Sequence, residues 1–290
     1  MPVQTATTGE LENAQGTIIA KALYTMEHSM PVINLIKKYL LTKGNKQVTV
    51  PKVGQVSFSD LSDGVDMVDT QDIGMTTVDL TAGEVGAKMI LTDKLVRQQN
   101  EDVFTICGNQ LGDGLGRKKD TDAIALFSAL NAGTALGADN AYLKMQNLQG
   151  CAAWAKANKL PLPISFVHHP YAVAYLAYQS AVTFATYPMP RGLSEDLLKD
   201  YYSGIKTNDV ALFEDGNIEK ISGYDSGYGA IFAQLAMAYL ESVGFNSERE
   251  RDASLRATEL NVTADYGLFE VVDGWGAPCQ YEIGALSTSG

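Results

Sequence analysis

The chain has few of the residues on which metal sites, disulfide frameworks and nucleic-acid surfaces depend. Its only cysteines are Cys107, Cys151 and Cys279, and none stands in a CxxC or Cys/His pattern with zinc-site spacing. We therefore expect reduced cysteines that pack the interior. Basic residues are also scarce, because 22 Lys and Arg stand against 34 Asp and Glu, for a formal net charge of -12. This balance argues against a nucleic-acid-binding surface, which would need clustered cations.

Long apolar runs are missing as well. No stretch approaches the roughly 20 apolar residues that a membrane span requires. Residues 1–16 lack the basic-then-apolar order of a signal peptide. We therefore expect a soluble protein that is intracellular when made and has no contact with a membrane. The hydrophobic content of 46% in 290 residues is nevertheless enough for a substantial core.

Residues 46–91 predict two β arms joined by an acidic tip. Apolar residues recur with a period of two in both arms, at Val48, Val50, Val56, Phe58, Val78, Leu80, Val85, Ala87, Met89 and Leu91. The sequence between the arms carries an aspartate at every third position: Asp60, Asp63, Asp66, Asp69 and Asp72. Such a loop is too acidic for a core, and an isolated two-stranded ribbon is marginal in water. We expect a ribbon that leaves the body of the protein and rests on something else.

Residues 93–130 predict the longest helix of the chain. Thr92 or Asp93 can cap it, and apolar residues follow at helical spacing. A continuous helix over this range would be about 57 Å long at 1.5 Å per residue. The four glycines within it, Gly108, Gly112, Gly114 and Gly116, each cost roughly 1 kcal/mol relative to alanine, which favours a bend near residues 112–116.

The remaining sequence predicts a mixture of helices and strands. We expect a helix over 141–159, then a buried strand, a turn at Pro170 and another helix. Residues 187–217 are rich in turn-forming residues, so we expect loop and short strand there. Residues 230–243 predict an amphipathic helix, SERERD a charged turn, and 255–274 and 277–286 the final strands.

In this order, the chain resembles the major capsid proteins of tailed bacteriophages, which share the Hong Kong 97 fold. The resemblance rests on the acidic loop, the long helix with RKKDTDAIALF, the strand-turn-helix of ISFVHHPYAVAYL, and the closing segment with Tyr266 and Gly267. It implies an α+β fold with an N-terminal arm (1–45), an extended loop (46–91) and a peripheral domain with a spine helix (92–140). An axial domain (141–245) and closing strands shared by the two domains (246–290) would complete it.

The resemblance also implies a structural role rather than an enzymatic one. The chain would self-assemble as hexamers and pentamers into the icosahedral shell of a virion, in the host cytoplasm. The shell would enclose double-stranded DNA without sequence-specific binding and without a cofactor, and scaffold, portal and decoration proteins would be further partners. The acidic tip of one subunit would face basic residues of its neighbour, with Arg117, Lys118 and Lys119 as first candidates and Arg249, Arg251 and Arg256 as second.

Two other interpretations compete with this one. An encapsulin-like compartment shell would have the same fold and a protein cargo, and sequence alone separates it poorly from a phage capsid. An α+β enzyme could use His168 and His169 for acid–base chemistry, although Pro170 beside them favours a turn and no nucleophile motif accompanies them. The glycines at 112–116 lack the phosphate-loop pattern, and the aspartates lack EF-hand spacing.

Overall fold

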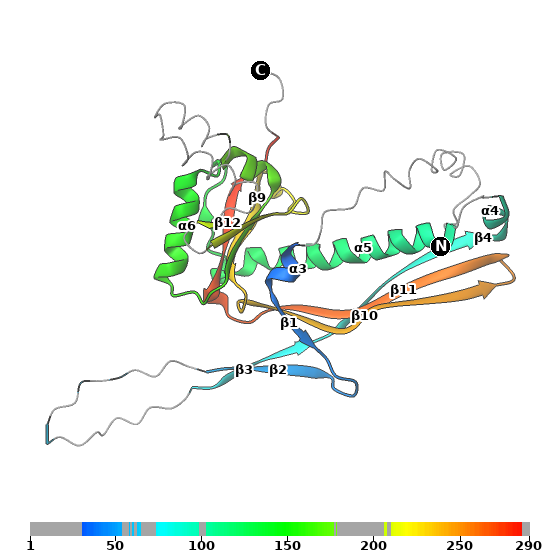
Figure 1. The fold of residues 1–290 in the computed structure, drawn as a ribbon, viewed down its shortest axis with the longest axis horizontal. Coiled ribbons are helices and arrows are strands. Elements are labelled where there is room, and N and C mark those ends of the chain that lie inside the picture. The colour runs from blue at the N-terminus through cyan, green and yellow to red at the C-terminus, as the bar shows by residue number, and fades with distance from the viewer. Residues whose placement is uncertain are drawn as a thin grey trace.

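A computed structural model describes residues 31–53, 58, 60, 63–64, 74–98, 103–176, 178, 206–207 and 210–285. The chain combines helices with two larger sheets and a separate ribbon, which is the α+β class expected from the sequence. A compact part with mixed sheet and helix stands at one end of a long helix and a long sheet, and the ribbon crosses beneath them (Figure 1). Among the described residues, no helix is both long and apolar enough to span a membrane.

The compact part is built on a six-stranded sheet. Its strands run in the order β5 (Leu136–Gly137), β12 (Gly276–Glu282), β9 (Ser226–Ala233), β6 (Ile164–His168), β8 (Val210–Glu214) and β7 (Lys206–Thr207). Helix α6 (Met145–Ala157) packs on it through a core that includes Leu148, Phe166 and Ile231. All five residues of β6 are buried, which explains why its apolar residues Ile164, Phe166 and Val167 do not alternate with exposed polar ones.

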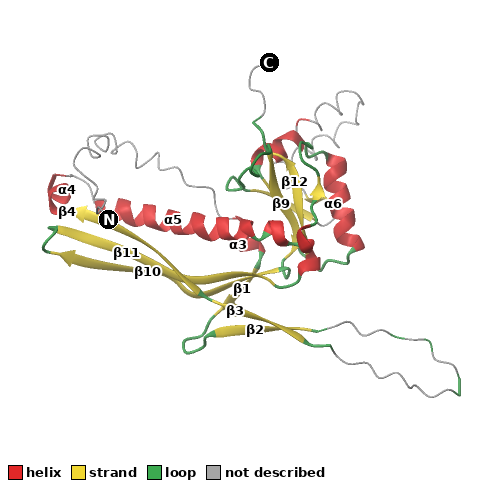
Figure 2. Ribbon diagram, turned by 180° about the vertical axis from the view of Figure 1, so that it is seen from behind, coloured by secondary structure: helices red, strands yellow, loops and turns green. Residues whose placement is uncertain are grey.

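The elongated part is a four-stranded sheet with a helix along it (Figure 2). The strand order is β1 (Lys37–Leu40), β10 (Met237–Asp252), β11 (Ala257–Glu270) and β4 (Gly83–Thr92). Helix α5 (Val103–Ala125) and the short α3 (Pro31–Leu35) meet this sheet and the compact part in one apolar cluster, which contains Ile36, Phe127, Phe232 and Tyr266. This junction core connects the two sheets and the long helix.

The ribbon is shorter than the sequence suggested. Strands β2 (Gln47–Lys52) and β3 (Thr76–Thr81) pair antiparallel with each other and, within the described residues, with no third strand. The predicted second arm divides at Ala82, after which β4 leaves the ribbon and pairs with β11 along its whole length. The alternation of Val85, Ala87 and Met89 therefore belongs to the long sheet, where pairing with β11 offers more area than the ribbon does.

The prediction of a long central helix is partly confirmed. Helix α5 has 23 residues and is the longest in the part of the chain that the structure describes. It runs through all four glycines without the expected bend (Figure 1). A single helix over 93–130 is wrong, because α4 (Asp93–Gln98) is a separate element and the chain after α5 continues as 3₁₀ turns, η2 (Phe127–Ala129) and η3 (Asn131–Gly133).

Several other elements follow the prediction. Helix α6, strand β6, the helical turns at 170–176, and strands β11 and β12 all form where the sequence placed a helix or a strand. A further 3₁₀ turn, η4 (Asp273–Trp275), separates the last two strands.

Two predictions are wrong in the C-terminal half. Residues 230–243 form the second half of β9 and the start of β10 instead of a helix, and the charged SERERD segment continues β10 instead of turning. The apolar run of β9 is buried between β12 and β6, so strand pairing outweighs local helix propensity.

Part of the predicted N-terminal arm also belongs to the body of the protein. Val32 and Ile36 are buried in the junction core, and β1 pairs in parallel with β10. Residues 1–30 lie outside the described part of the chain, so the arm itself stays a prediction.

Candidate assembly surfaces

The base of the ribbon packs against its own subunit. Leu80 is fully buried in a small cluster with Ala238, Leu240 and Val271 of the long sheet and its continuation. The side chain of Val78 is partly buried against the same cluster. The expectation that the whole ribbon leaves the body is therefore wrong at its base, because β3 is anchored there.

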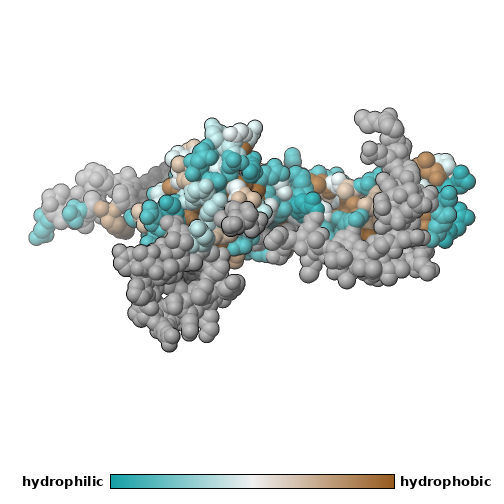
Figure 3. Space-filling view, turned by 90° about the horizontal axis from the view of Figure 1, so that it is seen from above, coloured by the Kyte–Doolittle hydropathy of each residue, from teal (hydrophilic) through white to brown (hydrophobic). Residues whose placement is uncertain are grey.

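Beyond its base, the ribbon exposes apolar side chains. Val53 is 64% exposed, Phe58 98% and Met75 63%, and Leu40 of the edge strand β1 is 76% exposed. In Figure 3, apolar atoms lie among hydrophilic ones on the narrow projection at the left of the view. Burying one such large side chain is worth about 1.5–3 kcal/mol. We call Val53, Phe58 and Met75 the ribbon patch. A second surface that buried these side chains would gain this stabilisation.

The acidic tip is described only in part. Asp60 and Asp63 are exposed, as a loop that no core accepts must be. Asp66, Asp69 and Asp72 lie outside the described residues, as does Val56. The grouping of five carboxylates against a neighbouring surface therefore stays a prediction.

The basic residues of the spine helix do not form one uniform patch. Arg117 and Lys118 are exposed, and Lys118 Nζ pairs with Asp122 Oδ1 at 2.5 Å, one turn further along α5. An exposed pair of this kind is worth little, about 0–1 kcal/mol. Both residues can therefore exchange their present contacts for a partner's carboxylates at small cost.

Lys119 has a different role from its two neighbours. Its Nζ donates to Glu241 Oε1 at 3.2 Å and to the main-chain oxygen of Gly244 at 3.2 Å. It also lies 5.6 Å from the ring centroid of Tyr239 and 5.4 Å from that of Tyr266, within cation–π range. The side chain is only 13% exposed. Lys119 therefore holds α5 to the long sheet, and the contact expected with a neighbour's tip falls to Arg117 and Lys118.

The second basic group lies at the far end of the long sheet. Arg251 forms a two-pronged ion pair with Asp93, the first residue of α4, with Nη2 2.8 Å from Oδ2. The main-chain oxygen of Arg256 accepts the Asp93 N–H at 2.9 Å. The hydrogen bond from Arg251 is the chief reason that the pKa of Asp93 is lowered. Arg249 is exposed on the same strand.

The two basic groups are therefore not brought together. Lys119 contacts Glu241, which precedes Arg251 by ten residues on β10, a separation of about 30 Å at the rise of a strand. Arg251 and Arg256 fasten α4 to the β10–β11 turn. The SERERD segment, which predicted a charged turn, instead lies on β10, and its Arg251 forms an ion pair with the neighbouring helix.

The histidine pair does not form an acid–base site. His168 is fully buried, its Nε2–H donates to the main-chain oxygen of Cys279 at 3.2 Å, and its Nδ1 accepts the N–H of His169 at 2.9 Å. Both ring nitrogens are thus satisfied in the neutral form. Burial lowers the pKa of His168 to about 3, so the ring is a structural link between β6 and β12. Burial also lowers the pKa of His169.

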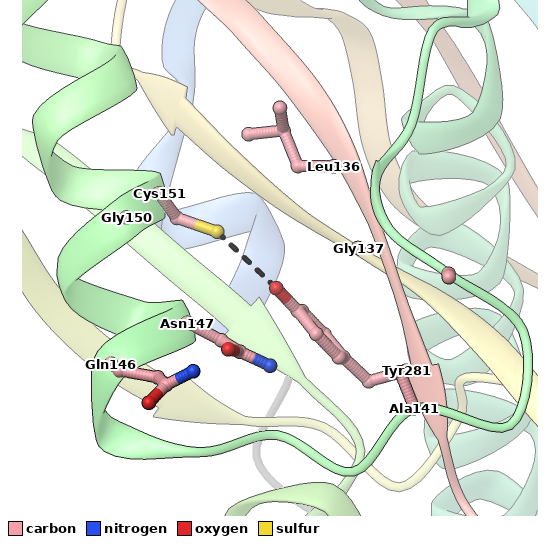
Figure 4. A pocket seen from close by; sticks show the side chains of 9 residues that line it. Leu136, Gly137, Ala141, Gln146, Asn147, Gly150, Cys151 and Tyr281 are labelled. Carbon is pink, nitrogen blue, oxygen red and sulfur yellow. Dashed lines mark hydrogen bonds between the residues drawn. The ribbon is translucent and has the colours of Figure 1, made fainter.

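A shallow depression of about 470 Å³ lies between α6 and β12 (Figure 4). Its lining includes Cys151, Tyr281, Gln146 and Asn147, and none of its nine lining residues is charged. Cys151 Sγ lies 3.6 Å from the Tyr281 hydroxyl and 4.0 Å from Cys279 Sγ. All three cysteines are free and buried, which confirms the expectation that they are reduced packing residues. The depression offers no charged group to a substrate.

The fold is that of known capsid structures. The capsid of Ralstonia phage GP4 matches with a TM-score of 0.67 and 10% identity, over 88% of this chain and 89% of that chain. The capsid of cyanophage Pam1 matches with a TM-score of 0.67 and 11% identity, over 86% and 88%. The capsid of a native GTA particle matches with a TM-score of 0.65 and 11% identity, over 97% and 94%. No family model and no curated protein sequence matches the chain. The capsid fold predicted from the sequence is thereby confirmed.

Proposed function

We propose that this protein is the major capsid protein of a tailed bacteriophage, the subunit of an icosahedral shell that encloses double-stranded DNA. The observation that carries the proposal is the ribbon patch on a chain with a capsid fold: Val53, Phe58 and Met75 stay exposed although the same chain buries a complete core elsewhere. A monomer that works alone gains nothing from such a surface, whereas a subunit with neighbours on every side does.

In this function, copies of the chain form hexamers and pentamers, and the ribbon of each lies across the adjacent subunit. The exposed Asp60 and Asp63 face basic side chains of that neighbour, with Arg117 and Lys118 on α5 as the first partners. Each such pair is worth only about 0–1 kcal/mol, so the charges select partner and register while the ribbon patch supplies most of the affinity. Contact of the N-terminal arm, predicted over residues 1–45, with a neighbour belongs to the same proposal.

The charge of the chain suits enclosure rather than binding. A formal net charge of -12 repels a polyanion, so the shell confines DNA without reading its sequence. Scaffold, portal and decoration proteins complete the assembly in the host cytoplasm, and the product is part of the virion. The similar structures are named as phage capsids, which favours this function over an encapsulin-like compartment. Nucleic acid rather than protein inside particles purified from the natural source distinguishes the two.

Assembly of the purified chain tests the proposal. Wild type should form closed particles in negative-stain electron micrographs, and Asp63→Lys should form markedly fewer while its subunits keep wild-type circular dichroism. The matched control is Glu219→Lys, which changes the net charge equally at an exposed position on the compact part. Adding Lys118→Glu to Asp63→Lys should partly restore particles. Equal particle yields for Asp63→Lys and wild type would show that the tip is only solvated. A chain that never leaves the monomeric state would contradict the shell function itself.

A further inference from the structure

Two buried carboxyl groups meet where the spine helix joins the compact part. Asp120 lies on α5, one turn before Ala123 of the junction core, and Asp215 directly follows β8. Both residues have an exposed fraction of 0%. Asp215 is fixed in place because its N–H donates to the main-chain oxygen of His168, at the end of β6, at 3.0 Å. The pair thus links the long helix to the six-stranded sheet.

The hydrogen bonds around the pair leave one oxygen of each carboxyl group without a donor. Asn217 Nδ2 donates to Asp120 Oδ2 at 3.0 Å, and the Asn217 N–H donates to Asp215 Oδ1 at 2.9 Å. Asp120 Oδ1 and Asp215 Oδ2 are buried and have no partner in the described part of the chain. A buried carboxylate oxygen without a donor is costly. One proton between the two carboxyl groups removes the cost, because a protonated Asp215 carboxyl group is a donor that Asp120 can accept.

Several charged groups near the pair are bonded to other residues. On α5, Lys119 faces Glu241, and Asp122 bonds Lys118 and the hydroxyl of Tyr266. His168 of β6 is a neutral imidazole directed at Cys279, and Lys220, beyond Asp215, pairs with Asp225.

Lys118, Lys119 and Lys220 thus each have a partner other than the two carboxyl groups. Burial, then the hydrogen bond with Asp120 and the repulsion from it, raises the pKa of Asp215 to about 8, and the Asn217 N–H opposes the change. A hard metal ion would need six or more oxygen ligands, and no cluster of three metal-ligating side chains occurs among the described residues. A proton is the cation that this site accommodates.

We propose that Asp120 and Asp215 share one proton and act as a latch that holds the spine helix against the six-stranded sheet and is released in alkaline solution. Loss of the proton places two unscreened negative charges in the junction core. The repulsion then acts between α5 and the end of β8, so the orientation of the helix relative to the compact part becomes dependent on pH.

The pH dependence of unfolding by urea tests the latch on the isolated subunit. The folded state holds a proton that an ordinary aspartate, with a pKa of 3.8, loses on unfolding. The contribution of this proton to the free energy of unfolding is fully present below about pH 4. It decreases as the pH rises towards 8 and is absent above that pH. For this group, the unfolding equilibrium constant rises about tenfold per pH unit between these limits.

Asp215→Asn provides the decisive variant, because its amide keeps the shape of the protonated acid and donates permanently to Asp120. We expect the variant to lose the tenfold rise of the unfolding equilibrium constant per pH unit. It should also be more stable than wild type at pH 8. Asp113→Asn is the matched control, since Asp113 is exposed on the same helix, and it should keep the wild-type slope. If the variant fails to fold, carboxyl carbon NMR of the wild type decides: one aspartate should titrate near pH 8.

An unchanged pH slope in Asp215→Asn, or titration of every aspartate below pH 5, would overturn the latch. A second experiment, which rests on the proposed shell function, uses assembled particles. Wild-type particles should dissociate at alkaline pH. Particles of Asp215→Asn should dissociate at a pH about one unit higher. Absence of particles would count against the shell function alone, because the titration of the subunit still decides whether the latch exists.

Discussion

The compact part and the ribbon satisfy their apolar side chains in opposite ways. In the six-stranded sheet, Phe166, Ile231 and Phe232 have exposed fractions of 0%, and strands on both sides of each supply its contacts. On the ribbon, Phe58 is 98% exposed and Met75 63%. Figure 2 shows the same contrast in the architecture, with layered elements at one end and a bare pair of strands below. One region is completed by its own chain, and the other requires a second surface.

The largest loss of stability in the compact part is expected from a substitution that adds atoms beside His168. The ring of His168 passes over Gly229 in β9 to reach β12, and a Cβ at Gly229 would overlap His168 Cδ2 and the main-chain oxygen of Val167. We expect Gly229→Ala to lower the free energy of unfolding by about 3 kcal/mol through overpacking, measured by urea denaturation.

A glycine without such a neighbour provides the control. A Cβ at Gly112 on α5 would meet no atom within 4 Å. Gly112→Ala should therefore raise the free energy of unfolding by roughly 0.5–1 kcal/mol through helix propensity. Equal losses in the two variants would show that the packing around His168 is looser than the structure indicates.

Two adjacent lysines sharpen the comparison on the spine helix, where the two parts meet. Lys119→Met removes a largely buried ammonium group with two hydrogen bonds, so we expect a loss of about 2 kcal/mol in the free energy of unfolding. Lys118→Met removes only an exposed pair and should cost less than about 0.5 kcal/mol. Assembly should respond in the reverse order, because Lys118 is the lysine that we propose faces a neighbour. Equal thermal stability of the two variants would remove the anchor role from Lys119.

The smallest effect on the subunit is expected at the ribbon patch. Phe58→Ser should change the free energy of unfolding by less than about 0.5 kcal/mol, because the side chain contacts almost nothing within its own chain. It should nevertheless raise the protein concentration required for assembly about tenfold or more, since about 2 kcal/mol of burial is lost at each contact. Light scattering against concentration measures this, with Tyr224→Ser, 53% exposed on the compact part, as control. A large loss of subunit stability in Phe58→Ser would instead place this residue in its own core.

The sequence predicted local structure well where a period or a cap specified it. Helix α6, strand β6 and the ends of the final strands follow from apolar spacing and from Pro and Gly positions. It failed at β9 and β10, because the spacing of Gln234 and Glu241 around the apolar residues fits an amphipathic helix as well as it fits two strands with buried apolar residues. The division of the second arm at Ala82 was also missed, since the partner strand β11 lies about 180 residues further along the chain.

The candidate site divides in the same way. The exposure of Asp60 and Asp63 follows from their spacing, because a loop with an aspartate at every third position cannot be buried without partners for the charges. Lys118 and Lys119 are indistinguishable in sequence, and only the approach of β10 and β11 gives Lys119 its anchor. Asp120 was not singled out at all, since its partner Asp215 meets it only through the tertiary fold.

The central claim, that the ribbon patch is completed by another copy of the chain, is tested most directly by oxidative footprinting of the unmodified protein. Phe58 and Met75 are the reporters, and Met237, with an exposed fraction of 0% in the subunit, is the internal reference. Modification of both reporters should fall at least about tenfold between dispersed subunits and assembled particles, while Met237 stays unmodified in both. Equal modification of Phe58 and Met75 in the two states would contradict the claim.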